Sequence, residues 1–176
     1  MQLNASPAMA SPGSQGWARL WWVLIFLETL AAPGLAWSAD ISDLPVQFQE
    51  KIDMARKACS DVNNGEFALE WGSVERIDLD GDLRPDWVLN EASFACSSAA
   101  SLYCGTGGCV SHFLVGKTIR SLQNLGWKVI TMGGARILVA NVHGSQCGSI
   151  GPSPCVTASI WDKAGQQWQS SVAQWD

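Results

Sequence analysis

The residues best suited to do chemistry are four aspartates in one short stretch. Asp78, Asp80, Asp82 and Asp86 occupy positions 1, 3, 5 and 9 of the sequence DLDGDLRPD. Ca²⁺ binds about six to eight oxygen atoms, and alternate residues of a tightly turning loop can direct their carboxylates to one centre. Gly81 allows the positive φ that such a loop often needs. Because these carboxylates would repel one another without a cation, the spacing predicts a calcium site.

A hairpin turn explains part of the same stretch without a metal. Asp80-Gly81 is a strong signal for a two-residue hairpin connection, and Pro85 suits a chain that enters an edge strand. Arg84 would then neutralise one neighbouring carboxylate. This explanation accounts for two of the positions but leaves the other three aspartates unexplained, so both explanations stay open and calcium is the prediction.

The stretch resembles the calcium loops of integrin-type FG-GAP repeats and related VCBS repeats. Their pattern is roughly Asp-x-Asp/Asn-Gly-Asp-Gly-x-x-Asp followed by apolar residues. The four aspartates and Gly81 match, residues 87–89 supply the apolar part, and Leu83 departs from the pattern, which has Gly there. The resemblance covers about a dozen residues and implies a structural Ca²⁺ held between two strands. More loosely, the whole chain resembles small exported bacterial proteins in which such an Asp loop precedes a Cys-Gly-x-Gly-Gly-Cys-like segment. That likeness implies no activity.

The first 39 residues have the pattern of a secretory signal peptide. Arg19 precedes the apolar block 20–27, and small residues follow it as far as Ala36. The block is shorter than the about 20 apolar residues that span a bilayer. Cleavage after Ala36, Ser38 or Ala39 would leave one domain, residues 40–176. We therefore expect an exported protein, periplasmic or secreted, without a stable membrane span once the signal is removed. An uncleaved N-terminal anchor is the alternative.

Six cysteines follow the predicted signal peptide. An even number of cysteines in an exported chain implies disulfides. Two pairs flank short loops rich in turn residues, whose ends can meet, and the third pair is what remains. The predicted pairs are Cys104–Cys109, Cys147–Cys155 and Cys59–Cys96. Zinc ligation by the first pair together with His112 is the alternative, but its spacing matches no common zinc module.

One helix and many short strands are expected in the remaining sequence. Apolar residues recur at helical spacing over residues 44–59, in a helix that Ser42 or Asp43 would cap and that would end by Asn63-Asn64-Gly65. Strands are expected at 66–71, 73–78, 86–90, 109–115, 118–122, 127–131, 135–142, 155–161 and 167–172.

These elements predict a mainly β (α+β) fold. It would be a small antiparallel sheet or sandwich with one N-terminal amphipathic helix, stapled by disulfides. Because segment 135–142 is almost continuously apolar, we expect it to be central and buried on both faces.

The rest of the sequence contains no recognisable catalytic motif. His112 and His143 are the only histidines, and no serine lies in a Gly-x-Ser-x-Gly sequence. The six tryptophans after the signal peptide are best explained by core packing, although a row of exposed ones would stack on sugars or anchor a partner. A net charge of −5 without a run of Lys or Arg argues against nucleic acid and leaves a protein or a glycan as the partner.

We therefore predict a non-catalytic, exported calcium-binding domain with a structural or binding role. The first alternative is a metal-free glycan- or protein-binding module that uses tryptophans and the Gly-rich loops. The second is a hydrolase of unrecognised type, which would require a cleft holding His112 or His143 beside a carboxylate.

Overall fold

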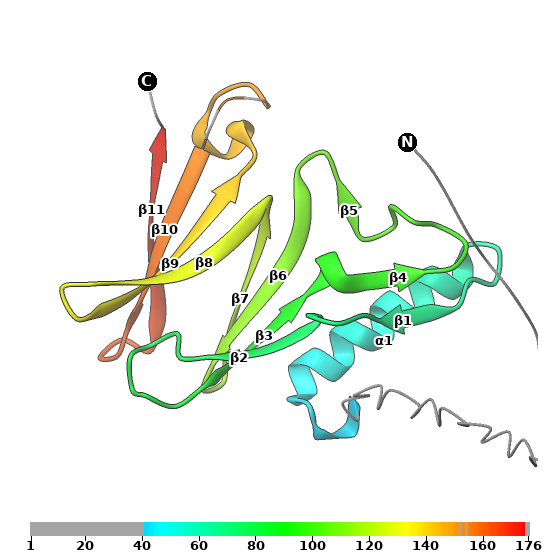
Figure 1. Cartoon of the computed structure of the whole chain (residues 1–176), viewed down its shortest axis with the longest axis horizontal. Coiled ribbons are helices and arrows are strands. Elements are labelled where there is room, and N and C mark those ends of the chain that lie inside the picture. The colour runs from blue at the N-terminus through cyan, green and yellow to red at the C-terminus, as the bar shows by residue number, and fades with distance from the viewer. Residues whose placement is uncertain (1–40, 152, 154, 175–176) are drawn as a thin grey trace, which may run out of the picture. The chain divides into compact units, whose positions relative to one another are not determined.

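The described residues fold as one α-helix followed by strands in three antiparallel sheets (Figure 1). This architecture comes from a computed structural model that describes residues 41–151, 153 and 155–174. The predicted signal peptide, residues 1–39, lies outside the described residues. Among the described residues no helix is long and apolar enough to cross a membrane. The predicted mainly β class with one N-terminal helix is confirmed.

The helix α1 (Val46–Asp61) begins later than its sequence signals predict. Ser42 and Asp43 lie instead in a short 3-10 turn, η1 (Ile41–Asp43), and Pro45 occupies the N-cap position without a side-chain cap. The prediction that Ser42 or Asp43 caps the helix is therefore wrong. The physical reason is that a residue before proline is biased away from the α region, so a helix running through Pro45 is disfavoured.

The end of α1 follows the sequence prediction. Asn63 and Asn64 have φ values of 49° and 54°, in the left-handed region that asparagine tolerates better than most residues. Phe48 and Ile52, one turn apart on the inner face, are fully buried. The amphipathic stripe therefore packs on the sheets as its spacing predicts.

Five strands form the central sheet. Its strands are β2 (Val74–Ile77), β3 (Asp86–Asn90), β5 (Cys104–Gly105), β6 (Gly108–Val115) and β7 (Thr118–Asn124). They run in the order β2-β3-β6-β5, and β7 also pairs with β6. A small two-stranded sheet pairs β1 (Phe67–Leu69) with β4 (Phe94–Cys96), and the 3-10 turn η2 (Glu91–Ser93) connects β3 to β4.

The C-terminal sheet contains four strands in the order β11-β10-β9-β8. They are β8 (Gly126–Met132), β9 (Ala135–Val142), β10 (Cys155–Asp162) and β11 (Gln167–Gln174), with the 3-10 turn η3 (Gly144–Cys147) between β9 and β10. Every strand predicted from the sequence is present; 86–90 and 135–142 have the predicted bounds, and the others differ at one or both ends. The short strands β4 and β5 were not predicted, because two or three residues are too few to show an alternating pattern.

The central sheet is the middle layer, and each of its faces packs against a different partner. Leu89 and Leu114 belong to a core with Phe48 and Ile52 of α1. The opposite face contributes Val88, Phe113 and Leu122 to a second core, shared with the C-terminal sheet through Leu138, Ala140 and Val142. Adjacent residues of β3 and β6 therefore serve two different cores, as the alternation of a strand requires.

Strand β9 lies inside the C-terminal sheet, as predicted, but it is not buried on both faces. Leu138, Ala140 and Val142 are buried, whereas Asn141 is exposed. The prediction of two buried faces is therefore wrong. The described part of the C-terminal sheet packs its core through one face, so Ile137 and Val139 on the other face of β9 are only half-buried.

All three predicted disulfides are present. Cys59–Cys96 ties the end of α1 to β4, Cys104–Cys109 joins β5 to β6, and Cys147–Cys155 closes the loop before β10. Because the sulfurs of Cys104 and Cys109 are bonded to each other, they are not available as zinc ligands beside His112. The zinc alternative is therefore excluded.

Removing the long-range disulfide should cost more stability than removing a local one. The bond Cys59–Cys96 spans 37 residues and Cys104–Cys109 only 5. In the chain-entropy model these loops correspond to about 4 and about 2 kcal/mol. We expect the double variant Cys59→Ala/Cys96→Ala to lose more free energy of unfolding than Cys104→Ala/Cys109→Ala in urea titrations. Equal losses would contradict the assignment of Cys59–Cys96 as the principal staple.

Candidate metal site

The aspartate loop connects β2 to β3 and is anchored at both ends. Ile77 and Asp86 pair across the two strands and close it. Within the loop, Leu79 is only 1% exposed and packs in the core between the central and C-terminal sheets. The buried side chain of Leu79 thus anchors the loop to the core. Its neighbours Asp78 and Asp80 are half-buried.

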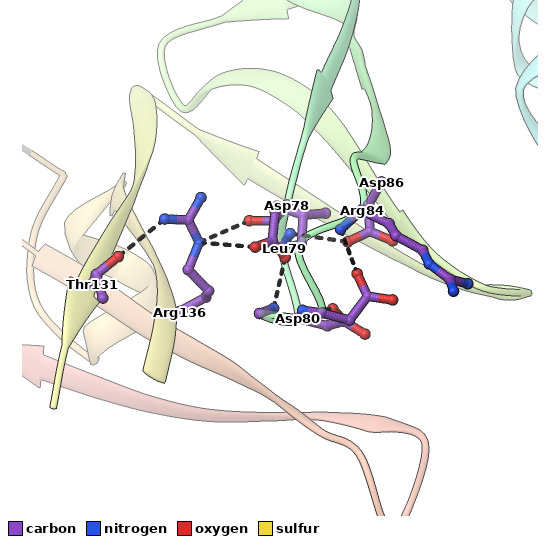
Figure 2. Close-up of polar contacts among 9 residues, drawn as sticks. Asp78, Leu79, Asp80, Arg84, Asp86, Thr131 and Arg136 are labelled. Carbon is purple, nitrogen blue, oxygen red and sulfur yellow. Dashed lines mark hydrogen bonds and ion pairs between the residues drawn. The ribbon is translucent and has the colours of Figure 1, made fainter. Parts of the chain in front are cut away.

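Backbone amides of the loop bind the carboxylates and fix their directions. The amide of Gly81 donates to Asp78 Oδ1 at 2.7 Å, and that of Asp82 donates to Asp80 Oδ1 at 2.8 Å. Across the loop, the amide of Leu79 donates to Asp86 Oδ2 at 2.9 Å. Figure 2 shows these side chains gathered around the loop backbone. Each of these bonds uses one carboxylate oxygen, so the second oxygen of each aspartate can contact a cation.

Three of the four predicted ligands come together. Asp78, Asp80 and Asp86 each offer an oxygen, and these atoms lie within 4.8 Å of one another. Two oxygens that bind the same Ca²⁺ at about 2.3–2.6 Å are at most about 5.2 Å apart, so the group is compatible with one shared ion. Asp82 is exposed and is not part of this group. Its carboxylate accepts a hydrogen bond of 2.8 Å from the amide of Arg84 instead.

Burial and neighbouring charges shift the pKa of the Asp86 carboxyl. Burial raises the pKa of its carboxyl above the usual value, and the negative charges of Asp80, Asp82 and Asp78 raise it further, while the hydrogen bond from Leu79 opposes them. The ionised form of Asp86 is therefore less favourable in the folded loop than in water. A bound cation would remove this disadvantage, because it attracts all of the surrounding carboxylates.

Arg136 is the residue of this site that the sequence analysis missed. From β9, its Nε donates to the backbone oxygen of Asp78 at 3.0 Å and lies 3.8 Å from Asp78 Oδ2, while Nη1 donates to Thr131 Oγ1 at 3.0 Å (Figure 2). The hairpin explanation expected Arg84 to neutralise a neighbouring carboxylate. In the same view, the side chain of Arg84 points away from the carboxylates. Because Arg136 lies 58 residues from Asp78, no local pattern could reveal the contact.

Glycine is needed at one position of the loop, and another position uses leucine where glycine would be expected. Gly81 has a φ of 78°, and a Cβ there would approach Arg136 Cγ to 3.3 Å, closer than an ordinary contact. Leu83 has a φ of 68° and is 90% exposed. The loop therefore takes a left-handed conformation at Leu83, the position where the resembled calcium loops have glycine.

The two histidines occupy different surroundings. His143 lines a cleft of about 510 Å³ and bonds Ser145, but no carboxylate is among the described residues that line this cleft. His112 is 3% exposed and lies 2.8 Å from Glu91 Oε1. Among the described residues, neither histidine combines the two features that a hydrolase would require. His143 lines a cleft without a carboxylate, and His112 contacts a carboxylate but does not line this cleft.

Most of the described tryptophans pack as predicted. Trp127, Trp161 and Trp168 contact the core between the central and C-terminal sheets, and Trp87 contacts the core beneath α1. Trp71 differs, because it is 97% exposed in the turn before β2. Trp175 lies outside the described residues. The described tryptophans therefore do not form an exposed row, although one of them is accessible to a partner.

Known proteins do not supply a function for this site. Comparisons with protein-family models, with curated proteins and with solved structures found no match to this chain.

Replacing Leu83 with glycine should stabilise the protein. A left-handed conformation costs a residue with a Cβ about 1–2 kcal/mol, and glycine avoids this cost but gains entropy in the unfolded chain. We expect Leu83→Gly to raise the free energy of unfolding by about 0.5–1 kcal/mol in calcium-free buffer. Leu83→Ala is the matched control, because it removes the exposed side chain but keeps the backbone strain. A gain with alanine equal to that with glycine would show that backbone strain is not the cause.

Removing the charge of Arg136 should destabilise the metal-free protein. Arg136→Met keeps most of the side-chain length but loses the hydrogen bond to Asp78 and the positive charge beside the carboxylates. We expect a loss of about 1–2 kcal/mol in the free energy of unfolding, measured with EDTA present. Arg84→Met removes a charge from the same loop and should change stability by less than about 0.5 kcal/mol. Equal effects would contradict the specific role given to Arg136.

Proposed function

We propose that this protein is an exported domain that binds one Ca²⁺ in the loop between β2 and β3, and that the ion takes no part in catalysis. The observation that carries the proposal is the group formed by Asp78, Asp80 and Asp86, whose ligand oxygens lie within 4.8 Å of one another. In this proposal the ion has a structural or binding role, and the protein binds a protein or glycan partner. Three disulfides support the exported location, because such bonds persist in oxidising compartments.

The donor atoms favour a hard cation. The three grouped residues offer only carboxylate oxygens, whereas zinc and copper sites in proteins usually include nitrogen or sulfur ligands. Ca²⁺ accepts about six to eight oxygens in flexible geometry, while Mg²⁺ demands near-ideal octahedral geometry. An exposed loop whose remaining ligands would be water or backbone oxygen suits the flexible ion better. Asp82 would add negative charge and shape the turn through its bond to Arg84.

The position of the loop supports a structural role for the ion. Leu79 belongs to the core between the two larger sheets, and Arg136 of β9 bonds the loop backbone at Asp78. A cation that fixes the carboxylates therefore also fixes the segment through which the β2–β3 hairpin contacts the C-terminal sheet. None of the three grouped aspartates lies beside a histidine or a nucleophile in the described contacts, so the ion would act as a staple.

Calcium titration of the mature protein tests the proposal. We expect heat of binding in calorimetry and a rise in melting temperature, because an ion that binds only the folded state stabilises it by about 2.7 kcal/mol at 100 times its dissociation constant. Mg²⁺ at the same concentration should have a smaller effect. Asp80→Asn should abolish the calcium response, since it removes a grouped carboxylate, whereas Asp82→Asn should weaken it.

A matched control lies in another turn of the chain. Asp162 accepts a hydrogen bond from the amide of Ala164, much as the loop aspartates bind backbone amides, but it is not part of the grouped carboxylates. Asp162→Asn should therefore leave the calcium response unchanged. The proposal fails if the unmodified protein shows neither heat nor a melting shift with calcium, or if Asp162→Asn removes the response as fully as Asp80→Asn.

A metal-free binding module is the second candidate, and Trp71 is the observation that favours it. An indole that is 97% exposed can stack on a sugar ring or anchor a protein partner. Metal analysis of the purified protein separates the two candidates, because only the first predicts bound calcium. Trp71→Ala would remove partner binding in the second candidate without affecting calcium binding in the first.

A further inference from the structure

A second cluster of reactive side chains lies away from the aspartate loop. His112 of β6 lies between two partners: its Nδ1 is 2.7 Å from Ser121 Oγ on β7, and its Nε2 is 2.8 Å from Glu91 Oε1 in η2. His112 and Ser121 are direct partners in the antiparallel register of β6 and β7. The sheet itself therefore sets the distance between the hydroxyl and the imidazole.

The two hydrogen bonds fix the tautomer of the imidazole. A carboxylate can only accept, so Nε2 must carry the proton that it donates to Glu91. In the neutral ring Nδ1 then has the lone pair, and the hydroxyl of Ser121 must donate to it. Glu91 thereby orients the ring so that its free nitrogen faces the serine.

The three residues of this cluster differ in how far they are buried. His112 is 3% exposed and the side chain of Glu91 is 22% exposed, so packing holds the base and the residue that orients it. Ser121 is an exposed residue, so a molecule from solution can approach it. A nucleophile within hydrogen-bond reach of a base, with the base oriented by a third group, is the arrangement that activates a serine.

We propose that Ser121, His112 and Glu91 form a site for acyl transfer from carboxylic esters, with Ser121 as the nucleophile. Ser121 Oγ forms a bond to the ester carbonyl carbon while its proton moves to His112 Nδ1. The carbon–oxygen bond to the alcohol then breaks, and His112 returns the proton to the departing alcohol. Water, deprotonated by the same nitrogen, hydrolyses the acyl-serine and restores the hydroxyl. Glu91 is a positioning residue that stabilises the transient imidazolium. This proposal does not depend on calcium.

The chain contains an internal comparison for this site. His143 Nδ1 also lies 2.7 Å from a serine hydroxyl, that of Ser145. Among the described contacts, however, His143 has no carboxylate partner, so nothing comparable to Glu91 orients its ring. The two pairs match in distance and differ in the third group, so Ser145 should be much less reactive than Ser121.

Covalent labelling is the most direct test. The mature protein is treated with an alkyl fluorophosphonate, and the labelled peptide is mapped by mass spectrometry. Attack by Ser121 Oγ on phosphorus displaces fluoride, and the proton passes through His112. We expect one phosphonyl group per chain, located on Ser121. The absence of a label, or a label on another residue, would overturn the proposal. Mapping the unmodified protein gives this result even if a variant fails to fold.

Variants show whether Ser121 reacts because His112 and Glu91 activate it or only because it is exposed. Ser121→Ala should abolish labelling, and Ser145→Ala should leave it unchanged. Glu91→Gln should slow labelling by about 100-fold, since positioned proton transfer contributes about 10²–10⁴-fold. It should also move the midpoint of the pH profile of labelling downward, because the imidazolium loses its anionic partner. A purely structural role for Glu91 would change the melting temperature without moving this midpoint, and an unchanged rate and profile would overturn its positioning role.

Discussion

The constraint on which this structure depends is the crowding of three carboxylates in one hairpin loop. Oxygens of Asp78, Asp80 and Asp86 lie close together, and the pKa of Asp86 is raised first by burial and then by the neighbouring carboxylates. The fold offsets the repulsion with backbone amides and with one guanidinium, that of Arg136. These groups orient the carboxylates and only partly balance their charge, and this is the basis on which we propose a divalent cation in the loop.

The same contacts link the loop to the rest of the molecule. Leu79 enters the core between the two larger sheets, and Arg136 reaches the loop from β9 while bonding Thr131 of β8. The conformation of the loop is therefore coupled to the packing of one sheet on the other. At the opposite face of the central sheet, Cys59–Cys96 ties α1 to β4. The bond Cys59–Cys96 and the loop thus stabilise different layers of the domain.

Local patterns in the sequence predicted much of this fold, and long-range contacts explain most of what they missed. Strand periodicity, the end of α1 before Asn63 and the two local cysteine pairs needed only neighbouring residues, and Cys59–Cys96 followed by elimination. The start of α1 was misplaced because Pro45 overrides the capping residues before it, and β9 is buried on one face because of how the sheets pack. In the site, the spacing of the aspartates correctly predicted that Asp78, Asp80 and Asp86 lie close together. It could not show that Asp82 turns toward Arg84, that Arg136 bonds the loop, or that β-sheet register places Ser121 beside His112. The calcium assignment and the FG-GAP/VCBS resemblance stay predictions.

A crystal structure of the mature protein grown with calcium tests the central claim most directly. The account predicts one ion with oxygens of Asp78, Asp80 and Asp86 at about 2.3–2.6 Å, and waters or backbone oxygens completing about six to eight ligands. Arg136 should keep its bond to the backbone of Asp78. Carboxylates that point separately into solvent, with no shared ion at saturating calcium, would contradict the account.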